Sequence, residues 1–506
     1  MRQAAEYFAA DRAVVFEGES LTFEQAWTRG IRLANALRDL GIKPGDRVAG
    51  LEDNTIAAVD LFLGAAIAGA VRVPLYARNS REGHAHMIGH TDASVLLVDA
   101  AYQESVEGLT EEVAALRHVV VRDDSYETWL ASQSDVDPDV PINDDDWYII
   151  RHSGGTTGKP KGVAYTHHDW LVCCRNWFYP VPRLTSNSVV AHAGAISHAS
   201  GYMFLPAWLH GGGNVVLRAF EPGTVLETMS RERVTHMFLA PVMLQALTRH
   251  PDVRRYDWSH LDALLIGSAP ITDATALAGH DVFGDALFQV YGQTEALPLS
   301  AMSSKEWFGT VEGSTPMRAA GRVVPFAQVQ IWDADGNRLG LGEEGEIVAR
   351  VEAQMRGYWR DEALTKERLV GGWVRTGDIG WLDKNGYLYV CDRADDMIIS
   401  GGFNIWPAEL ETVICDHSDI IEVAVFGIPD EKWGETPVAR CYVLEDAAVT
   451  EQEVIDLCIQ RLGSYKKPAR VEFVHEPLPR SPVGKLQRKL LREPYWQGHS
   501  RRVAGA

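Results

Sequence analysis

The chain has 506 residues, of which 46% are hydrophobic and 23% charged, and a net charge of −21. This length predicts three or four compact units, and the composition is that of an ordinary soluble globular protein. The acidic balance argues against nucleic acid or an anionic membrane as the main partner. The longest apolar run, from Leu61 to Val71, is too short to span a bilayer. We find no signal peptide at the N-terminus, and six cysteines without a CxxC pair indicate free thiols in a reducing cytoplasm.

The first half of the chain alternates helical and strand patterns. Residues Thr22 to Leu40 carry apolar side chains at helical spacing, and the pattern stops at Gly41. A strand pattern follows at Arg47–Leu51, a buried helix at Ala57–Ala70 and a further strand at Val95–Asp99. This alternation predicts largely parallel sheets covered by helices.

A glycine-rich segment, Ser153 to Gly162, reads SGGTTGKPKG. Glycines allow several backbone N–H groups to converge on one concavity, and the hydroxyls and Lys161 add donors and charge, which suits phosphate oxygens. The segment fails the Walker pattern, because Pro160 stands where Ser or Thr binds the metal. Strand patterns at Trp147–Ile150 and Gly162–Tyr165 flank it. We therefore predict a phosphate-holding loop at a hairpin tip; the alternative is a plain surface turn.

Short strands with tight turns begin after about residue 320. They include Gln328–Trp332, Glu346–Val351 and Tyr387–Cys391, and a domain boundary is expected near residues 392–396. In the smaller α/β unit that follows, Thr450 begins a capping box. From Arg461 to Arg492 there are nine Lys and Arg residues, which form either a solvated face or a docking site for a small polyanion.

Six motifs between residues 150 and 490 resemble the adenylate-forming superfamily, which includes acyl-CoA synthetases, peptide-synthetase adenylation domains and beetle luciferases. After the glycine-rich loop they are Gly267–Pro270, Tyr291–Glu295, Trp373–Asp378, Ser400–Glu411 and Pro479–Arg488. The resemblance implies an N-terminal domain of layered α/β subdomains plus a β-rich subdomain, residues 1–392. It also implies a small, mobile α+β C-terminal domain, residues 393–506, with a hinge near Asp395.

The resemblance implies an ATP site with Mg²⁺. Thr294 would bind the α-phosphate and Glu295 the metal, since a carboxylate facing a triphosphate needs a hard cation between them. Asp378 would accept the ribose hydroxyls, and Lys485 would be the catalytic lysine, beside Thr294, Glu295 and His198. The nucleotide-binding residues are Ser153, Gly154, Gly155, Thr156, Thr157, Gly158, Lys161, Ser268, Ala269, Pro270, Tyr291, Gly292, Gln293, Thr294, Asp378 and Arg393.

Coenzyme A and an acid would complete the site. The family's pantetheine tunnel corresponds to Gly401, Gly402 and Phe403, Trp433 would pack on the coenzyme, and Tyr465, Lys466 and Lys467 would meet its nucleotide. The expected acid pocket consists of Trp177, His198, Gly201, Tyr202, Gly267, Tyr291 and Leu297. His198 stands where amino-acid-activating members carry Asp, and small residues at 201 and 267 favour a bulky hydrophobic or alicyclic acid. His198 is either a pocket gate or an ordinary core histidine.

These features predict a cytoplasmic, AMP-forming acyl-CoA ligase, monomeric or homodimeric. The alternatives are an enzyme that performs only thioesterification of a preformed adenylate, a ligase that loads a carrier protein, a luciferase-like monooxygenase, and a catalytically dead binding protein. Lys161, Thr294, Glu295, Asp378, Arg393 and Lys485 argue against the last of these. The chain departs from the family pattern at Asp392, where Gly is more frequent, and at Arg151 and His152, where apolar or aromatic residues often stand.

Overall fold

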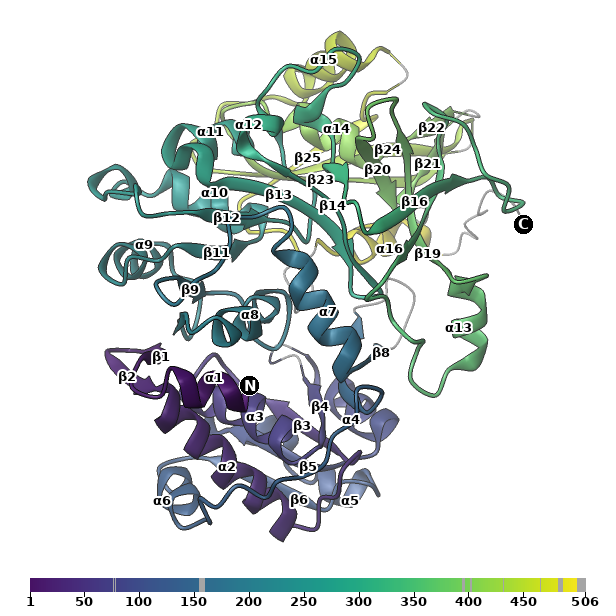
Figure 1. The fold of residues 1–506 in the computed structure, drawn as a ribbon. Coiled ribbons are helices and arrows are strands. Elements are labelled where there is room, and N and C mark those ends of the chain that lie inside the picture. Colours follow the sequence, from purple (N-terminus) through teal and green to yellow (C-terminus); the bar gives the residue numbers. More distant parts are fainter. Residues whose placement is uncertain are drawn as a thin grey trace.

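The computed structural model describes residues 1–75, 77, 79–153, 160–393, 396–400, 403–430, 432–464, 466–480 and 486–497, and at 153, 393, 403 and 404 it describes the backbone alone. The described strands form four sheets. Figure 1 shows one sheet in the purple N-terminal lobe, a second in the teal middle of the molecule, and the yellow-green C-terminal elements in its upper part.

The sheet of the N-terminal lobe has six strands. They are β3 (Arg47–Leu51), β4 (Val71–Pro74), β5 (Ala93–Asp99), β6 (His118–Arg122), β7 (Trp147–Ser153) and β8 (Lys161–Thr166). Their order is β6-β5-β3-β4-β7-β8, and all neighbours are parallel except β7 and β8, which form an antiparallel hairpin. This confirms the parallel sheet expected from the β/α alternation.

The middle sheet has nine strands. They are β1 (Arg12–Phe16), β2 (Glu19–Thr22), β9 (Val189–His192), β10 (Gly213–Val216), β11 (His236–Leu239), β12 (Ala263–Ile266), β13 (Leu287–Gln293), β14 (Ala296–Ser303) and β15 (Arg322–Val323). Their order is β15-β14-β13-β12-β11-β9-β10-β1-β2, with a parallel centre from β1 to β13. The carboxyl ends of β12 and β13 therefore open on the same edge.

Helices cover these two sheets. They are α1 (Arg2–Tyr7), α2 (Phe23–Asp39), α3 (Ile56–Ile67), α4 (Arg81–Thr91), α5 (Leu109–Glu112), α6 (Tyr126–Ala131), α7 (His167–Trp177), α8 (Phe204–Leu209), α9 (Pro222–Arg231), α10 (Pro241–Arg249), α11 (Asp273–Phe283) and α12 (Ser304–Trp307). A further helix, α13 (Glu362–Arg368), packs instead on the β-rich part of the chain. Short 3₁₀ turns lie at Ala100–Val106, Ala199–Tyr202, Val253–Arg255, Gly284–Ala286 and Pro316–Arg318. Helix α7 runs between the two sheets (Figure 1).

Local sequence explains how α2 and α3 form and pack. Thr22 caps α2 in a capping box with Gln25. Helix α3 is apolar except for Asp60, in keeping with its burial along almost its whole length. A Cβ at Gly30 of α2 would lie 2.8 Å from the Leu63 Cβ of α3, so the glycine is what lets the two helices approach this closely.

The β-rich part and the C-terminal unit follow. The first contains β16 (Ala327–Trp332), β17 (Gly345–Val351), β18 (Leu369–Val370), β19 (Trp373–Leu382) and β20 (Leu388–Arg393). The second contains β21 (Ile398–Ser400), β22 (Phe403–Ile405), α14 (Pro407–Ile414), β23 (Ile420–Asp430), β24 (Gly434–Val443), α15 (Glu451–Leu462), β25 (Arg470–Val474) and α16 (Arg488–Trp496). The C-terminal unit has its own sheet and apolar core, which confirms the predicted fold class of a large and a small α/β domain.

The chain changes sheet across residues 394–397. Strand β20 ends at Arg393 and pairs with β19, whereas β21, which starts at Ile398, belongs to the C-terminal sheet. The predicted boundary after residue 392 falls one residue inside β20, and the proposed hinge Asp395 lies outside the described residues. All six cysteines are free, as predicted. Among the described helices, none has the length and apolar character needed to cross a membrane.

Candidate active site

The glycine-rich loop joins β7 to β8, as predicted for a hairpin tip. The last backbone pair before the loop is Ser153 with Lys161, and residues 154–159 lie outside the described part of the chain. At its base, Nε2 of His86 lies 3.2 Å from the Pro160 carbonyl oxygen. The role of the glycine-rich loop in binding phosphate stays a prediction.

Asp378 is held in a defined orientation by two residues of the YGQTE motif. The Tyr291 hydroxyl and the Gln293 amide nitrogen both donate to Oδ2 of Asp378 at 2.6 Å, and Gln293 also donates to the Thr376 carbonyl at 2.9 Å. A carboxylate offers about four acceptor positions, and these two bonds fix the orientation in which Asp378 would meet a ribose. The structure therefore brings together two motifs that are more than eighty residues apart.

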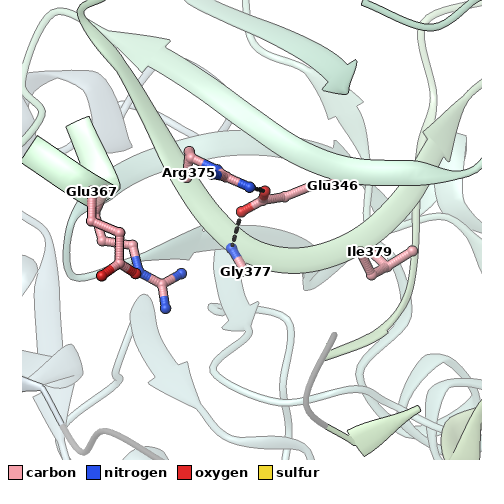
Figure 2. A pocket seen from close by; sticks show the side chains of 6 residues that line it. Glu346, Glu367, Arg375, Gly377 and Ile379 are labelled. Carbon is pink, nitrogen blue, oxygen red and sulfur yellow. Dashed lines mark hydrogen bonds and ion pairs between the residues drawn. The ribbon is translucent and has the colours of Figure 1, made fainter. Parts of the chain in front are cut away.

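Beside Asp378, Glu346 supports the part of strand β19 (Trp373–Leu382) that carries it. Figure 2 shows Glu346 between Arg375 and Gly377, on the wall of a cavity of about 220 Å³. Its carboxylate accepts from Arg375 Nε at 2.8 Å and from the Gly377 N–H at 3.2 Å. Gly377 has φ +70°, a conformation that favours glycine. Sequence reasoning missed Glu346, because nothing in a strand pattern marks one of its polar residues as the support of another strand.

Glu295 and Lys161 converge on Tyr358. The Tyr358 hydroxyl donates to Oε1 of Glu295 at 3.0 Å, and the Lys161 Nζ lies 6.0 Å from the centre of the Tyr358 ring. Thr294 is fixed by its carbonyl, which accepts from the Tyr165 hydroxyl at 2.6 Å. Tyr358 was missed, since it lies between β17 and α13 in a segment without a periodic pattern.

The segment predicted as the adenine wall lies at the edge of the nine-stranded sheet where β12 and β13 end. Gly267 directly follows β12, and Ser268, Ala269 and Pro270 are exposed beyond it. Strand β12 is parallel to β13, whose end carries Tyr291 and Gly292. Backbone pairing also sets Arg393 opposite Asp378. The expected nucleotide-binding residues that the structure describes therefore gather from three parts of the chain.

Replacing Asp378 with Asn should weaken ATP binding. The amide keeps the size of the side chain but removes the charge and one acceptor, at a cost of about 1.5–3 kcal/mol for a hydrogen bond to a charged group. We expect the KM for ATP to rise by about 10-fold to 100-fold, with a much smaller change in the KM for the acid. Steady-state pyrophosphate release at varied ATP measures this, and an unchanged KM for ATP would contradict the assignment of Asp378.

The predicted acid pocket has an aromatic wall. Trp177 stacks on Tyr202 at 5.6 Å between ring centres and meets Phe238 edge-on at 6.3 Å, and Tyr202 also stacks on Trp170 at 5.1 Å. Leu297 contacts helix α7, which carries Trp170 and Trp177, since the Leu297 carbonyl oxygen lies 3.9 Å from the Cys173 Sγ.

Gly201 and Gly267 were expected to make room for a bulky acid, but the structure gives another reason for both glycines. A Cβ at Gly201 would lie 1.8 Å from the Ile196 carbonyl oxygen, and one at Gly267 would lie 2.9 Å from the Val290 carbonyl oxygen. Close approach of the backbone accounts for both glycines. Their small size therefore gives no support to a large pocket, and the acid's bulk has to be argued from other residues.

His198 is a partly buried histidine that is neutral near pH 7. Burial lowers its pKa well below the usual value, and the charges of Arg151 and Arg72 act in the same direction. Its Nδ1 lies 2.7 Å from the Ser197 hydroxyl oxygen. A neutral imidazole of this kind can donate one hydrogen bond to a ligand and accept another, but it lacks the second ring proton that an imidazolium would give as a general acid.

Buried histidines should also make the stability of the fold sensitive to acid. Burial lowers the pKa of His152 to about 3 and that of His192 to about 4. The unfolded chain binds a proton on each near pH 6.5, so stability is present above that pH and is lost as the pH falls toward the folded values. Each such histidine costs about 1.4 kcal/mol per pH unit in this window.

We therefore expect the urea midpoint of the N-terminal domain to fall between pH 6.5 and pH 5.5, and the fall to be smaller in the His152→Gln variant. Tryptophan fluorescence during urea unfolding measures both midpoints. A midpoint that is flat across this window in the parent protein would show that these histidines are accessible to protons in the folded state.

The expected coenzyme residues are only partly described. Trp433 is 48% exposed with the Lys432 Nζ 4.4 Å above its ring, and Lys467 is exposed, while Lys466 donates to Glu409 at 2.8 Å. Phe403 lies in β22. Gly401, Gly402, Tyr465 and Lys485 lie outside the described residues.

Much of the basic stretch after residue 460 is neutralised by ion pairs. Arg461 pairs with Asp416 at 2.8 Å, Arg480 pairs with Glu422, and Arg488 pairs with Glu411 at 2.6 Å. These ion pairs argue against a bare docking patch for these three residues; Arg461 lies on a solvated face, as one of the two interpretations expects, whereas Arg488 is largely buried.

Comparisons with known proteins agree with this geometry. Residues 1–359 match the family model of the AMP-binding enzymes, and residues 409–485 match the model of the AMP-binding enzyme C-terminal domain. The chain is similar to the feruloyl-CoA synthase of Amycolatopsis sp, with 36% identity over 94% of both chains. It is also similar to the fatty acid–[acyl-carrier-protein] ligase ScoC of Streptomyces coeruleorubidus, with 30% identity over 97% of this chain and 95% of the relative.

The structure resembles that of ATP-bound MatB from Rhodopseudomonas palustris, with a TM-score of 0.88 and 26% identity over 98% of this chain and 99% of the other. The chain therefore belongs to the AMP-binding enzyme family, in the acyl-CoA synthetase type of the adenylate-forming superfamily. It is an AMP-forming acid–thiol ligase that uses ATP, as the motifs predicted.

Proposed function

We propose that the enzyme activates a bulky, largely apolar carboxylic acid as its acyl-adenylate and then transfers the acyl group to coenzyme A. The observation that carries the proposal is the hydrogen-bonded set around Asp378, with Tyr291 and Gln293 at 2.6 Å, beside Glu295 and Lys161. An anchored ribose carboxylate next to a metal ligand and a phosphate lysine is what alignment of ATP for attack at the α-phosphorus requires.

Each of these groups has a separate task in the first half-reaction. The acid's carboxylate attacks the α-phosphorus and pyrophosphate leaves, so negative charge has to be screened throughout. Glu295 would hold Mg²⁺. In proteins this ion is commonly bound through one or two carboxylates, with phosphates and water as its other ligands. A single carboxylate therefore suffices here, although the described residues contain no cluster of three or more Asp, Glu, His or Cys ligands. When bound, the metal would neutralise charge on the phosphates. Asp378 and Tyr291 would fix the ribose.

The second half-reaction would use the C-terminal domain in another orientation. We place the domains at residues 1–392 and 393–506, with rotation about Asp395, because the chain changes sheet between β20 and β21. The expected adenylation lysine, Lys485, and the expected pantetheine segment, residues 401–404, both belong to this smaller domain. A thiolate of coenzyme A would attack the acyl carbon, and AMP would leave.

The aromatic wall supports the choice of acid. Trp177, Tyr202 and Phe238 offer stacked and edge-on ring faces, which bind planar or alicyclic bodies well. The amino-acid class is disfavoured by His198, which is neutral and stands where a carboxylate would hold a substrate amine.

A panel of carboxylic acids tests the proposal. The panel should contain aryl, alicyclic, long-chain and α-amino acids, and each is scored separately for acid-dependent pyrophosphate exchange and for thioester formation. Free coenzyme A and a phosphopantetheinylated carrier protein serve as parallel acceptors. We expect exchange and coenzyme A thioester with aryl or alicyclic acids. Exchange without thioester on coenzyme A would point to the carrier protein, and absence of exchange with every acid would refute the adenylation step.

A further inference from the structure

Two arginines are buried on one face of the six-stranded sheet. Arg72 of β4 is 2% exposed and Arg151 of β7 is 4% exposed. Arg72 is paired with Ile149 in the parallel register, and side chains alternate along a strand. Arg151, two residues beyond Ile149, therefore projects from the same face as Arg72.

Neither guanidinium has a carboxylate partner among the described residues. The Arg72 guanidinium lies 4.1 Å above the Phe62 ring, and its Nε and Nη1 are buried without a hydrogen-bond partner. Arg151 donates to the Tyr202 hydroxyl and lies 4.5 Å from the centre of that ring, while its Nε has no partner. The neighbouring Glu52 is already paired with Arg122 at 2.5 Å.

This arrangement is unusual within the same protein. Among the described residues, the third fully buried arginine, Arg122, is matched to Glu52. The partly buried Arg29 and Arg488 are matched to Asp60 at 2.7 Å and to Glu411 at 2.6 Å. A guanidinium stays protonated in proteins, and an unpaired buried charge costs several kcal/mol. Two such groups on one face call for an anion from outside the chain.

The two charges lie beside the expected acid site. Arg151 contacts Tyr202, which stacks on Trp177 of the aromatic wall. Both arginines act on His198, where they help to lower its pKa. In the hairpin, Arg151 pairs with Val163 and Ser153 with Lys161, so Lys161 follows diagonally on the same face. A row of three cations thus runs from the phosphate loop toward the acid pocket.

We propose that Arg151 and Arg72 form a carboxylate-binding subsite for the acid substrate, an inference that rests on the proposed ligase function. Guanidinium groups bind carboxylates through paired, charge-assisted hydrogen bonds. The carboxylate is either the one that reacts with ATP or a second one carried by the acid. Arg151 is also one of the positions at which the sequence departs from the pattern it resembles, in which an apolar or aromatic residue often stands.

The test uses Arg72→Met and Arg151→Met, with Arg254→Met as a matched control, because Arg254 is an exposed arginine paired with Asp281. The ligands are 3-phenylpropanoate and its 4-carboxy derivative. Binding to the full-length enzyme is measured without turnover through tryptophan fluorescence, and kcat and KM are measured by pyrophosphate release. Loss of one charged contact should weaken binding by about 10-fold to 100-fold.

If the second carboxylate is the ligand, the parent enzyme prefers the diacid, and both variants lose that preference while 3-phenylpropanoate is unaffected. If the reacting carboxylate is the ligand, both acids weaken equally in both variants. Arg151→Lys should restore part of the binding, and the midpoint of thermal unfolding should stay at or above the parent value, because an unpaired charge has been removed.

Three results would overturn the subsite: unchanged binding in both variants, a change in the KM for ATP alone, or no binding of either acid to the parent enzyme. Acid binding without pyrophosphate release would refute the ligase proposal and leave the subsite standing. Should a Met variant fail to fold, the corresponding Lys variants and the diacid preference of the parent enzyme decide the question.

Discussion

Replacing Lys485 with Ala should reduce acid-dependent pyrophosphate exchange by about 10³-fold, whereas transfer from preformed acyl-AMP to coenzyme A should change only slightly. In the first half-reaction a carboxylate approaches an α-phosphate, and charge then moves onto pyrophosphate. A lysine that reaches both groups lowers the free energy of that transition state. It has no such task when a thiol attacks the acyl carbon.

The flanks of the Lys485 loop are well fixed. Arg480 and Leu486 form an antiparallel bridge, and the Gln487 N–H donates to the Pro479 carbonyl at 2.9 Å. Arg488 then enters α16 with its guanidinium on Glu411. Residue 485 therefore directly precedes a residue that this bridge holds in place.

The two half-reactions should be assayed separately on the same enzyme preparation. Lys489→Ala is the matched control, since Lys489 is an exposed lysine of α16 within 3.8 Å of Glu493. Unimpaired exchange in Lys485→Ala, or an equal loss in the control, would remove Lys485 from its assigned role.

Replacing Asp395 with Pro should spare adenylation and reduce thioester formation by about 100-fold or more. Proline fixes φ near −65° and removes an N–H, so a rotation of the backbone at this position would be blocked. The enzyme would keep only the orientation in which it makes acyl-AMP. Bound acyl-AMP should then accumulate, which can be measured in single-turnover experiments with a labelled acid.

Asp395→Ala is the control, because alanine removes the side chain but leaves the backbone free to rotate. We expect it to retain both half-reactions within a few-fold. Equal loss of adenylation and thioesterification in Asp395→Pro would argue against rotation at residue 395 and toward general damage to the boundary between β20 and β21.

Local patterns predicted the elements well. Helix α2 with Thr22 as its cap, α15 with its capping box at Thr450, and the hairpin around the glycine-rich loop all follow from short-range chemistry. The motifs that meet at Asp378 were recognisable because each carries its own spacing. For these the sequence was sufficient.

Contacts between distant segments were harder to predict. Tyr358 supports Glu295, and Glu346 supports the strand residue Gly377 before Asp378, yet nothing periodic marks either Tyr358 or Glu346. Residue 201 has to be glycine because the Ile196 carbonyl oxygen occupies the space of a Cβ, and this contact is visible only in the folded structure. Arg72 and Arg151 project from the same face of the sheet because of the register between β4 and β7. This register cannot be read from the sequence, since β4 and β7 are far apart along the chain.

Asp392 links the two parts of the chain across the residues where the sheet changes. Its carboxylate accepts from the Ala408 N–H of α14 at 3.1 Å and lies 3.8 Å from the Arg488 guanidinium of α16. Any reorientation of the C-terminal unit has to exchange these contacts for water. A glycine at residue 392 would make neither contact and so would not favour the present orientation of the C-terminal unit over another. If the C-terminal unit rotates as we propose, the side chain at 392 contributes to the equilibrium constant between the two orientations, and raising the ionic strength should shift that equilibrium away from the orientation observed here.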